Sequence, residues 1–178
     1  YPDFENSGTE QPKIDLRLDY DVREDAILSV GAGYAGTDGI IHTGIGPFDI
    51  KKGSDLSYAK FDWNKSAFRV GFFANFLEAD SSNLVSVGTD GQPLGFKFST
   101  DTYNFDLSNT TVAGAHNIFT YGANYRDSKF DLEIAPEGYH VAEYDLSLLY
   151  TREWRALSVT SGLTNYFFDT EDGGRERH

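Results

Sequence analysis

The sequence predicts an all-β protein, and three observations carry that prediction. Strict two-residue alternation of apolar and polar residues recurs along the chain, helical periodicity is poor throughout, and short turns alternate regularly with long connections. Alternation is typical of strands whose two faces meet different surroundings. Strands of roughly 9 to 11 residues, joined by short turns on one side and long loops on the other, are typical of transmembrane barrels. We therefore expect an antiparallel up-and-down transmembrane β-barrel, with about eight strands of a larger barrel present.

The first hairpin is the clearest case. From Lys13 to Val22 every even position is apolar and every odd position is charged, and residues 23–25 then turn the chain into a second alternating run at 28–34. The pattern predicts one face against lipid and the other against the lumen or solvent. The lipid-facing residues are Ile14, Leu16, Leu18 and Tyr20, and the opposite face carries Asp15, Arg17 and Asp19.

Three more hairpins follow in the same style. Their strands are expected at 58–63 and 68–76 around a turn at 64–66, at 102–108 and 119–125 around a turn near 110–114, and at 142–150 and 157–163 around a turn at 152–154. Long connections are expected at 36–55, 78–99 and 127–138.

Aromatic residues recur at or near the predicted strand ends. Amphipathic rings prefer the boundary between hydrocarbon and headgroups, so this placement predicts aromatic girdles. The residues are Tyr20, Tyr34, Trp63, Phe76, Tyr103, Tyr125, Tyr150 and Trp154.

Composition excludes several classes. The 15 Lys and Arg residues against 28 Asp and Glu give a net charge of −13, whereas a nucleic-acid partner requires a clustered basic surface. The absence of cysteine excludes zinc–thiolate sites, disulfides and cysteine nucleophiles, and suits an oxidising compartment. No run approaches the roughly 18 to 20 apolar residues of a membrane-spanning helix.

The predicted topology places both chain ends on the side of the long loops, outside the cell. An intact bacterial barrel normally begins and ends on the periplasmic side, and the chain also lacks a methionine at position 1. We therefore expect a contiguous slice of a larger barrel, with residues 1–168 forming a partial outer-membrane barrel domain and residues 169–178 forming a loop or flexible tail.

Several stretches resemble the barrel of TonB-dependent outer-membrane receptors. These are Gly36–Asp49, Phe73–Leu77, Asn83-Leu84, Thr100–Tyr103, His116–Arg126, Phe130–Leu132 and Ala135-Pro136. The resemblance covers most of residues 10–168 and matches early-to-middle barrel strands. It implies a 22-stranded barrel blocked by an N-terminal plug and located in the bacterial outer membrane. Such a receptor takes up a scarce nutrient of the siderophore, cobalamin or carbohydrate class, with energy from TonB through an N-terminal region of the parent chain. The sequence departs from the family because it contains neither plug, nor TonB-contacting segment, nor closing C-terminal strand.

Candidate site residues are those that face the lumen by parity or lie in a loop. Tyr58, Arg69 and Asn75 are expected to line a ligand path, and His42 lies in a predicted loop. Hydration or plug packing is the more ordinary role for Tyr58, Arg69 and Asn75, and a solvated or hydrogen-bonded imidazole is the more ordinary role for His42.

Chemistry beyond binding has little support. The four histidines, His42, His116, His140 and His178, are too far apart for a local ligand motif, and the loop aspartates lack calcium-loop spacing. No Gly-x-Ser-x-Gly elbow is present, and no serine has a nearby histidine base. We expect no enzyme activity, no metal and no cofactor.

Three alternatives stay open at this point. The first is a small closed eight-stranded outer-membrane barrel, including an outer-membrane hydrolase. The second is a soluble lipid binder of lipocalin type, which would turn its apolar residues inward. The third is a structural or adhesive role through the long loops.

Overall fold

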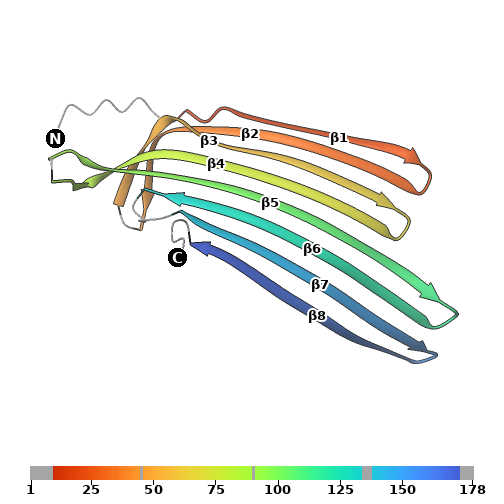
Figure 1. The fold of residues 1–178 in the computed structure, drawn as a ribbon. Coiled ribbons are helices and arrows are strands. Elements are labelled where there is room, and N and C mark those ends of the chain that lie inside the picture. Colours follow the sequence, from red (N-terminus) through yellow and green to blue (C-terminus); the bar gives the residue numbers. More distant parts are fainter. Residues whose placement is uncertain (1–9, 45, 90, 134–137, 173–178) are drawn as a thin grey trace.

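The computed structural model describes residues 10–44, 46–89, 91–133 and 138–172, and these form one antiparallel sheet (Figure 1). Each strand pairs with its neighbours in sequence, and no helix occurs in this part of the chain. The strands are β1 (Lys13–Arg23), β2 (Ala26–Thr43), β3 (Gly46–Lys65), β4 (Phe68–Val87), β5 (Pro93–Ala113), β6 (Asn117–Leu132), β7 (Tyr139–Trp154) and β8 (Leu157–Asp172). The prediction of an all-β, up-and-down arrangement of eight strands is confirmed.

The sheet is open. Its strand order runs from β1 to β8 without closing, so these two strands form the edges. Each edge strand presents a row of backbone N–H and C=O groups toward its open side.

The register places most of the large apolar residues between the short turns and the middle of the strands on one face, which we call the apolar face. One row crosses the sheet from Leu18 through Val30, Phe61 and Phe72 to Phe105. It continues through Tyr125 and Tyr144 to Phe167. Because side chains alternate along a strand, the residues between these positions lie on the opposite face, which we call the polar face.

The strands are longer than predicted. They contain 11 to 21 residues, and the predicted connections at 36–55 and 78–99 are largely strand. The β2–β3 connection is only residues 44–45, and the β4–β5 connection is residues 88–92. We call the strand residues in these two regions the far segment: residues 36–43, 46–55, 78–87 and 93–99.

Irregular pairing explains why the far segment looked like loop. The β2–β3 register shifts between Thr37 and Gly39, and the β3–β4 register shifts between Ile50 and Asp55. Gly39 and Gly53 adopt positive φ at these two shifts, 123° and 101°. A bulge interrupts the two-residue alternation while the backbone pairing continues, so periodicity alone missed these strands.

The other strand boundaries differ less from the predicted ones. The short turns lie at 24–25, 66–67, 114–116 and 155–156, one to four residues from their predicted positions, and the β6–β7 connection is 133–138. The predicted tail at 169–178 is wrong in part, because β8 continues to Asp172; residues 173–178 lie outside the described residues.

Aromatic residues of the apolar face pair across strands. Trp63 meets Phe68 edge to face with centroids 5.7 Å apart, and Phe119 lies 5.0 Å from Tyr150, both close to the short turns. Farther from the turns, further pairs form a second band: Phe76 with Tyr103 at 5.6 Å, and Tyr125 with Tyr144 at 4.9 Å. The prediction that Tyr34, Phe76, Tyr103 and Tyr125 stand near strand ends is wrong, because their strands run on past them.

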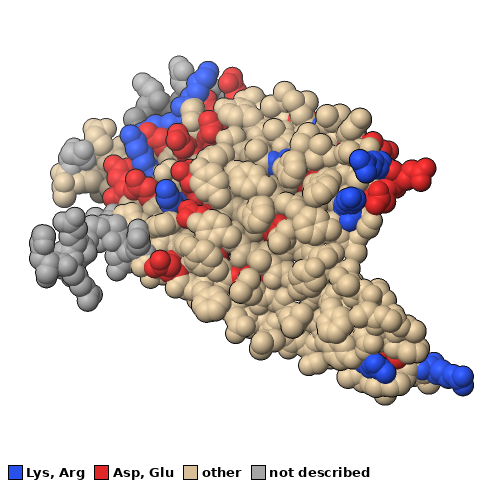
Figure 2. All heavy atoms as spheres, turned by 45° about the vertical axis from the view of Figure 1, so that its right-hand side comes forward, with Lys and Arg blue, Asp and Glu red and all other residues tan. Residues whose placement is uncertain are grey.

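Charged side chains gather at the two ends of the strands, and a broad uncharged band separates them over the middle of the face shown in Figure 2. Large side chains of the apolar face are exposed, including Leu16 at 63 %, Leu146 at 56 % and Leu163 at 64 %. The sheet therefore leaves an extended apolar surface without a covering layer among the described residues.

Candidate functional site

The polar face carries two neighbouring rows of opposite charge. The acidic row consists of Asp19, Asp62, Asp106 and Asp145, which stand on β1, β3, β5 and β7 and are linked across the sheet by their pairing partners Ser29, Gly71 and Asn124. The basic row lies two residues away along the strands and consists of Arg17, Lys60 and Arg126.

Ion pairs connect the two rows. Arg17 Nε lies 2.9 Å from Asp19 Oδ2, and Lys60 Nζ lies 3.0 Å from Asp62 Oδ2. Arg69 enters from the other side of the acidic row, with Nη2 3.4 Å from Asp62 Oδ1 and Nε 3.9 Å from Asp106 Oδ2. Aspartates on alternate strands stand about 10 Å apart, so one guanidinium fits between Asp62 and Asp106. The polar face thus carries paired charges from β1 to β5, whereas Arg126 and Asp145 make no ion pair among the described residues.

Glycines create the space that some of these side chains occupy. The Tyr58 ring lies over Gly33, and its hydroxyl donates a hydrogen bond to Asp15. A Cβ at Gly33 would collide with that ring, and a Cβ at Gly71 would collide with the Asp106 carboxylate. Small residues on the even strands therefore let side chains of the odd strands lie flat across the sheet.

The structure places three of the four predicted site residues on one face and brings two of them side by side. Tyr58 and Asn75 are direct pairing partners on the polar face, and Arg69 lies on the same face six residues closer to the short turn. His42 is exposed near the tip of β2, nine residues beyond Gly33, the partner of Tyr58, which corresponds to roughly 30 Å. It does not join the other three.

Sequence analysis missed the acidic row as a unit. Its signal is an aspartate flanked by two apolar residues on every strand that enters a short turn: Leu18-Asp19-Tyr20, Phe61-Asp62-Trp63, Phe105-Asp106-Leu107 and Tyr144-Asp145-Leu146. Aligning the strands on these triplets would have found the register that places the four carboxylates in one row.

Two hollows open on the polar face. The larger, about 500 Å³, is lined by Lys60, Asp62, Arg69, Phe73, Asn104 and Arg126 among others. A smaller one of about 210 Å³ lies beside Tyr58 and Asp15. Phe73 stacks on Tyr58 with a centroid distance of 6.2 Å and is 38 % exposed. Aromatic rings beside hydrogen-bonding and charged groups are the ordinary lining of a small-molecule site.

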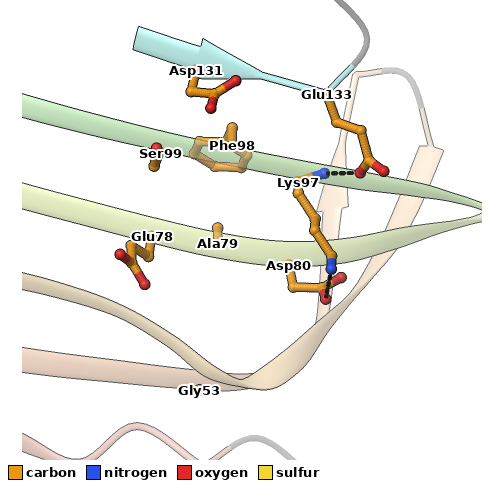
Figure 3. A pocket seen from close by; sticks show the side chains of 9 residues that line it. All are labelled: Gly53, Glu78, Ala79, Asp80, Lys97, Phe98, Ser99, Asp131 and Glu133. Carbon is orange, nitrogen blue, oxygen red and sulfur yellow. Dashed lines mark hydrogen bonds and ion pairs between the residues drawn. The ribbon is translucent and has the colours of Figure 1, made fainter. Parts of the chain in front are cut away.

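A third hollow, of about 490 Å³, lies in the far segment and includes Glu78, Asp131 and Phe98 (Figure 3). Lys51 and Lys97 both contact the Asp80 carboxylate there, at 2.8 and 3.5 Å. The hydrogen bond from Lys51, together with the charges of the two lysines, keeps the pKa of Asp80 below its ordinary value. The Ser54 hydroxyl donates to the Asp80 carbonyl, and the Asp80 amide donates to Ser54 Oγ. The carboxylate is therefore held in a structural network.

The described ranges contain no cluster of three or more His, Asp or Glu residues arranged to hold a metal ion. His140 Nε2 lies 2.8 Å from Asp127 Oδ2, His116 is exposed in the β5–β6 turn, and His178 lies outside the described residues. Within those ranges, no helix is long and apolar enough to cross a membrane.

Comparison of the chain with family models, curated proteins and solved structures gives no match, so the function of the polar face has to be inferred from its own geometry.

Proposed function

We propose that the eight strands are part of the wall of an outer-membrane β-barrel, and that the protein is a TonB-dependent receptor that takes up a scarce nutrient. The observation that carries the proposal is the two-faced sheet: an apolar, aromatic-rich surface across all eight strands on one side and paired charges from β1 to β5 on the other. Lipid covers the first face, and the second faces a hydrated lumen.

Exposure of the apolar face supports a lipid partner. Monomeric soluble proteins rarely expose contiguous apolar patches larger than a few hundred Å². Here Leu16, Leu18, Phe72 and Leu163 are all exposed on one surface. Hydrocarbon removes the cost of that exposure, whereas the charged ends of the strands remain in the headgroup region and water.

The stagger of the hairpin tips supports a barrel. Ala26, at the first tip, shares a row with Lys65, Phe68 and Leu148, and Trp154 at the last tip lies six residues beyond Leu148. If the tips lie in one plane, six residues across the five strand spacings from β2 to β7 correspond to a tilt of about 40°. Barrel strands tilt by roughly 35 to 45°.

The free edges favour a barrel larger than eight strands. In hydrocarbon the backbone groups along β1 and β8 must be paired, and these two strands do not pair with each other. Further strands of the parent barrel complete both edges in our proposal. A closed eight-stranded barrel would instead join β1 to β8.

The polar face carries the ligand-facing residues. Tyr58 lines the smaller hollow, Arg69 lines the larger one, and Asn75 pairs with Tyr58 on the same face. These three residues would line the path of a siderophore, cobalamin or carbohydrate. TonB would supply energy through an N-terminal region of the parent chain.

Fractionation and uptake together test the proposal. The protein should sediment with outer membranes and require detergent for extraction. Uptake of a labelled ferric siderophore, cobalamin or oligosaccharide should depend on both the protein and TonB, and Tyr58→Ala should reduce it more than His42→Ala. Extraction by buffer alone would contradict the membrane assignment and support the soluble lipid binder. A β1–β8 cross-link formed within one chain would support the closed small barrel.

A further inference from the structure

Arg152 is a charged residue on the apolar face, near the tip of the β7–β8 hairpin. It shares the parity of Leu148 and Tyr150 on β7, whereas its neighbour Glu153 points to the opposite face. Basic side chains predominate at this tip, at the lower right of Figure 2. A charged side chain on an apolar surface is costly unless a partner binds it, so the contacts of Arg152 need to be explained.

Arg152 is held in place by neutral groups. Its Nη1 donates to Asn117 Oδ1 at 2.7 Å, and the Tyr150 hydroxyl donates to the same oxygen at 2.8 Å. The guanidinium also stacks over the Trp154 ring, 5.7 Å from its centroid. Amide, phenol and indole thus orient the guanidinium without neutralising it.

Within the described part of the chain, no carboxylate lies within ion-pair distance of Arg152. Three of the four polar-face cations described above differ in this respect: Arg17, Lys60 and Arg69 each contact an aspartate, and only Arg126 makes no ion pair among the described residues. Arginine has five N–H donors in a planar fork, so most of this fork points to no protein acceptor.

A hollow of about 360 Å³ adjoins the guanidinium. It is lined by Tyr150, Arg152, Trp154, Val159 and Ser161, all on the apolar face. Trp154 and Val159 are about half exposed, at 52 % and 48 %. The hollow therefore combines one fixed cation and two hydroxyls with apolar walls continuous with the lipid-facing band.

We propose that this hollow binds the phosphate of an anionic phospholipid, with the acyl chains lying along the band. The proposal rests on the membrane-spanning function proposed above. Arginine matches phosphate geometry with parallel N–H bonds, and tryptophan is enriched at the headgroup level. The apolar walls favour a lipid over free phosphate, because a free anion gains nothing from Val159 and exposed indole.

Quenching of Trp154 fluorescence by brominated lipids tests the site. These 178 residues contain two tryptophans, so Trp63→Phe leaves Trp154 as their only reporter, and tryptophans elsewhere in the parent chain are replaced by phenylalanine in the same background. The intact protein is then reconstituted in vesicles. We compare two samples of the same mixture of phosphatidylglycerol and phosphatidylcholine: in one the phosphatidylglycerol is brominated, and in the other the phosphatidylcholine is brominated. One cation near the surface should enrich the anionic lipid at Trp154 about fivefold.

Arg152→Gln should abolish the enrichment while general quenching by both lipids persists. Lys65→Gln is the matched control, since it removes one cation from the tip of β3, far from the hollow, and should preserve the enrichment. Arg152→Lys should keep part of the enrichment, because lysine keeps the charge, and lose the rest, because lysine lacks the planar fork.

Failures of the two proposals are distinguishable. If neither brominated lipid quenches Trp154, the membrane-spanning function is contradicted. Equal quenching by both lipids before substitution would contradict the lipid site alone. Displacement of the brominated lipid by inorganic phosphate, beyond the effect of matched chloride, would show a free-phosphate site and overturn the lipid assignment.

Discussion

Each of the long strands β2 to β5 has one part near the short turns and one part in the far segment, and these two parts differ in the residues on their faces. Between the short turns and the Tyr34–Phe76 level, apolar and polar residues largely separate, with Phe73 as an exception on the polar face, and Lys60 and Arg69 pair with Asp62 on that face. In the far segment the backbone ladder continues, yet Ser81, Asn83 and Ser54 are buried and lysines and acids mix with apolar residues. The same strands therefore pass through two environments. Backbone pairing continues into the far segment, whereas the alternation of apolar and polar residues occurs only where the two faces of the sheet have different surroundings.

The largest expected effect comes from placing a charge on the apolar face. Leu16→Arg should lower the free energy of unfolding by about 2 to 4 kcal/mol if Leu16 lies at the bilayer midplane. Arg17→Leu, its neighbour on the polar face, should cost much less. Urea unfolding in vesicles measures both, and equal costs would contradict the assignment of the faces.

Glycine substitutions sharpen the comparison of the two parts. A Cβ at Gly122, close to the short turns, would lie 2.9 Å from the Leu107 carbonyl oxygen, whereas a Cβ at Gly95 in the far segment meets nothing within 4 Å. Gly122→Ala should destabilise by about 1 to 3 kcal/mol, and Gly95→Ala should be neutral or slightly stabilising. A larger cost at Gly95 in the same unfolding assay would break the comparison.

Removing one carboxylate from the acidic row should have a smaller effect. Asp62→Asn leaves Lys60 without its partner and weakens the hold on Arg69, at a cost of about 1 kcal/mol because both cations are half exposed. The cost should shrink at high salt. A cost that is unchanged by salt would indicate packing by the Asp62 side chain as the cause.

The smallest effect concerns pH in the far segment. Because the pKa of Asp80 is lowered in the folded protein, its contribution is present above the unfolded pKa and is lost as pH falls through the folded value. The protection of the Asp80 amide, which donates to Ser54, against hydrogen exchange should therefore decrease in acid, measured as the ratio of the intrinsic to the observed exchange rate at each pH. The same measurement on Asp80→Asn should show no such pH dependence.

The strands could be predicted from the sequence only where the two faces of the sheet have different surroundings. Leu16 and Phe105 alternate with charged or polar neighbours because their strands have two different sides, so those strands and their order were found. Gly39 and Gly53 sit at register shifts, and a shift removes periodicity without ending the strand. The far strands were therefore taken for loops.

The candidate site divides in the same way. Parity along each strand put Tyr58, Asn75 and Arg69 on one face, which the structure bears out. His42 lies beyond the shift at Gly39, where parity no longer carries over from the near residues. The acidic row needed cross-strand register, which becomes readable only when repeated triplets such as Phe61-Asp62-Trp63 are aligned with one another.

Spin-label accessibility tests the central claim most directly. The chain has no cysteine, so single cysteines at each position from Tyr103 to Leu107 and from Leu94 to Ser99 can be labelled without background in lipid vesicles. We predict a two-residue period in the first set, with oxygen collisions high at Tyr103, Phe105 and Leu107, and no such period in the second. Uniform access to the water-soluble nickel reagent across both sets would contradict a lipid-facing sheet.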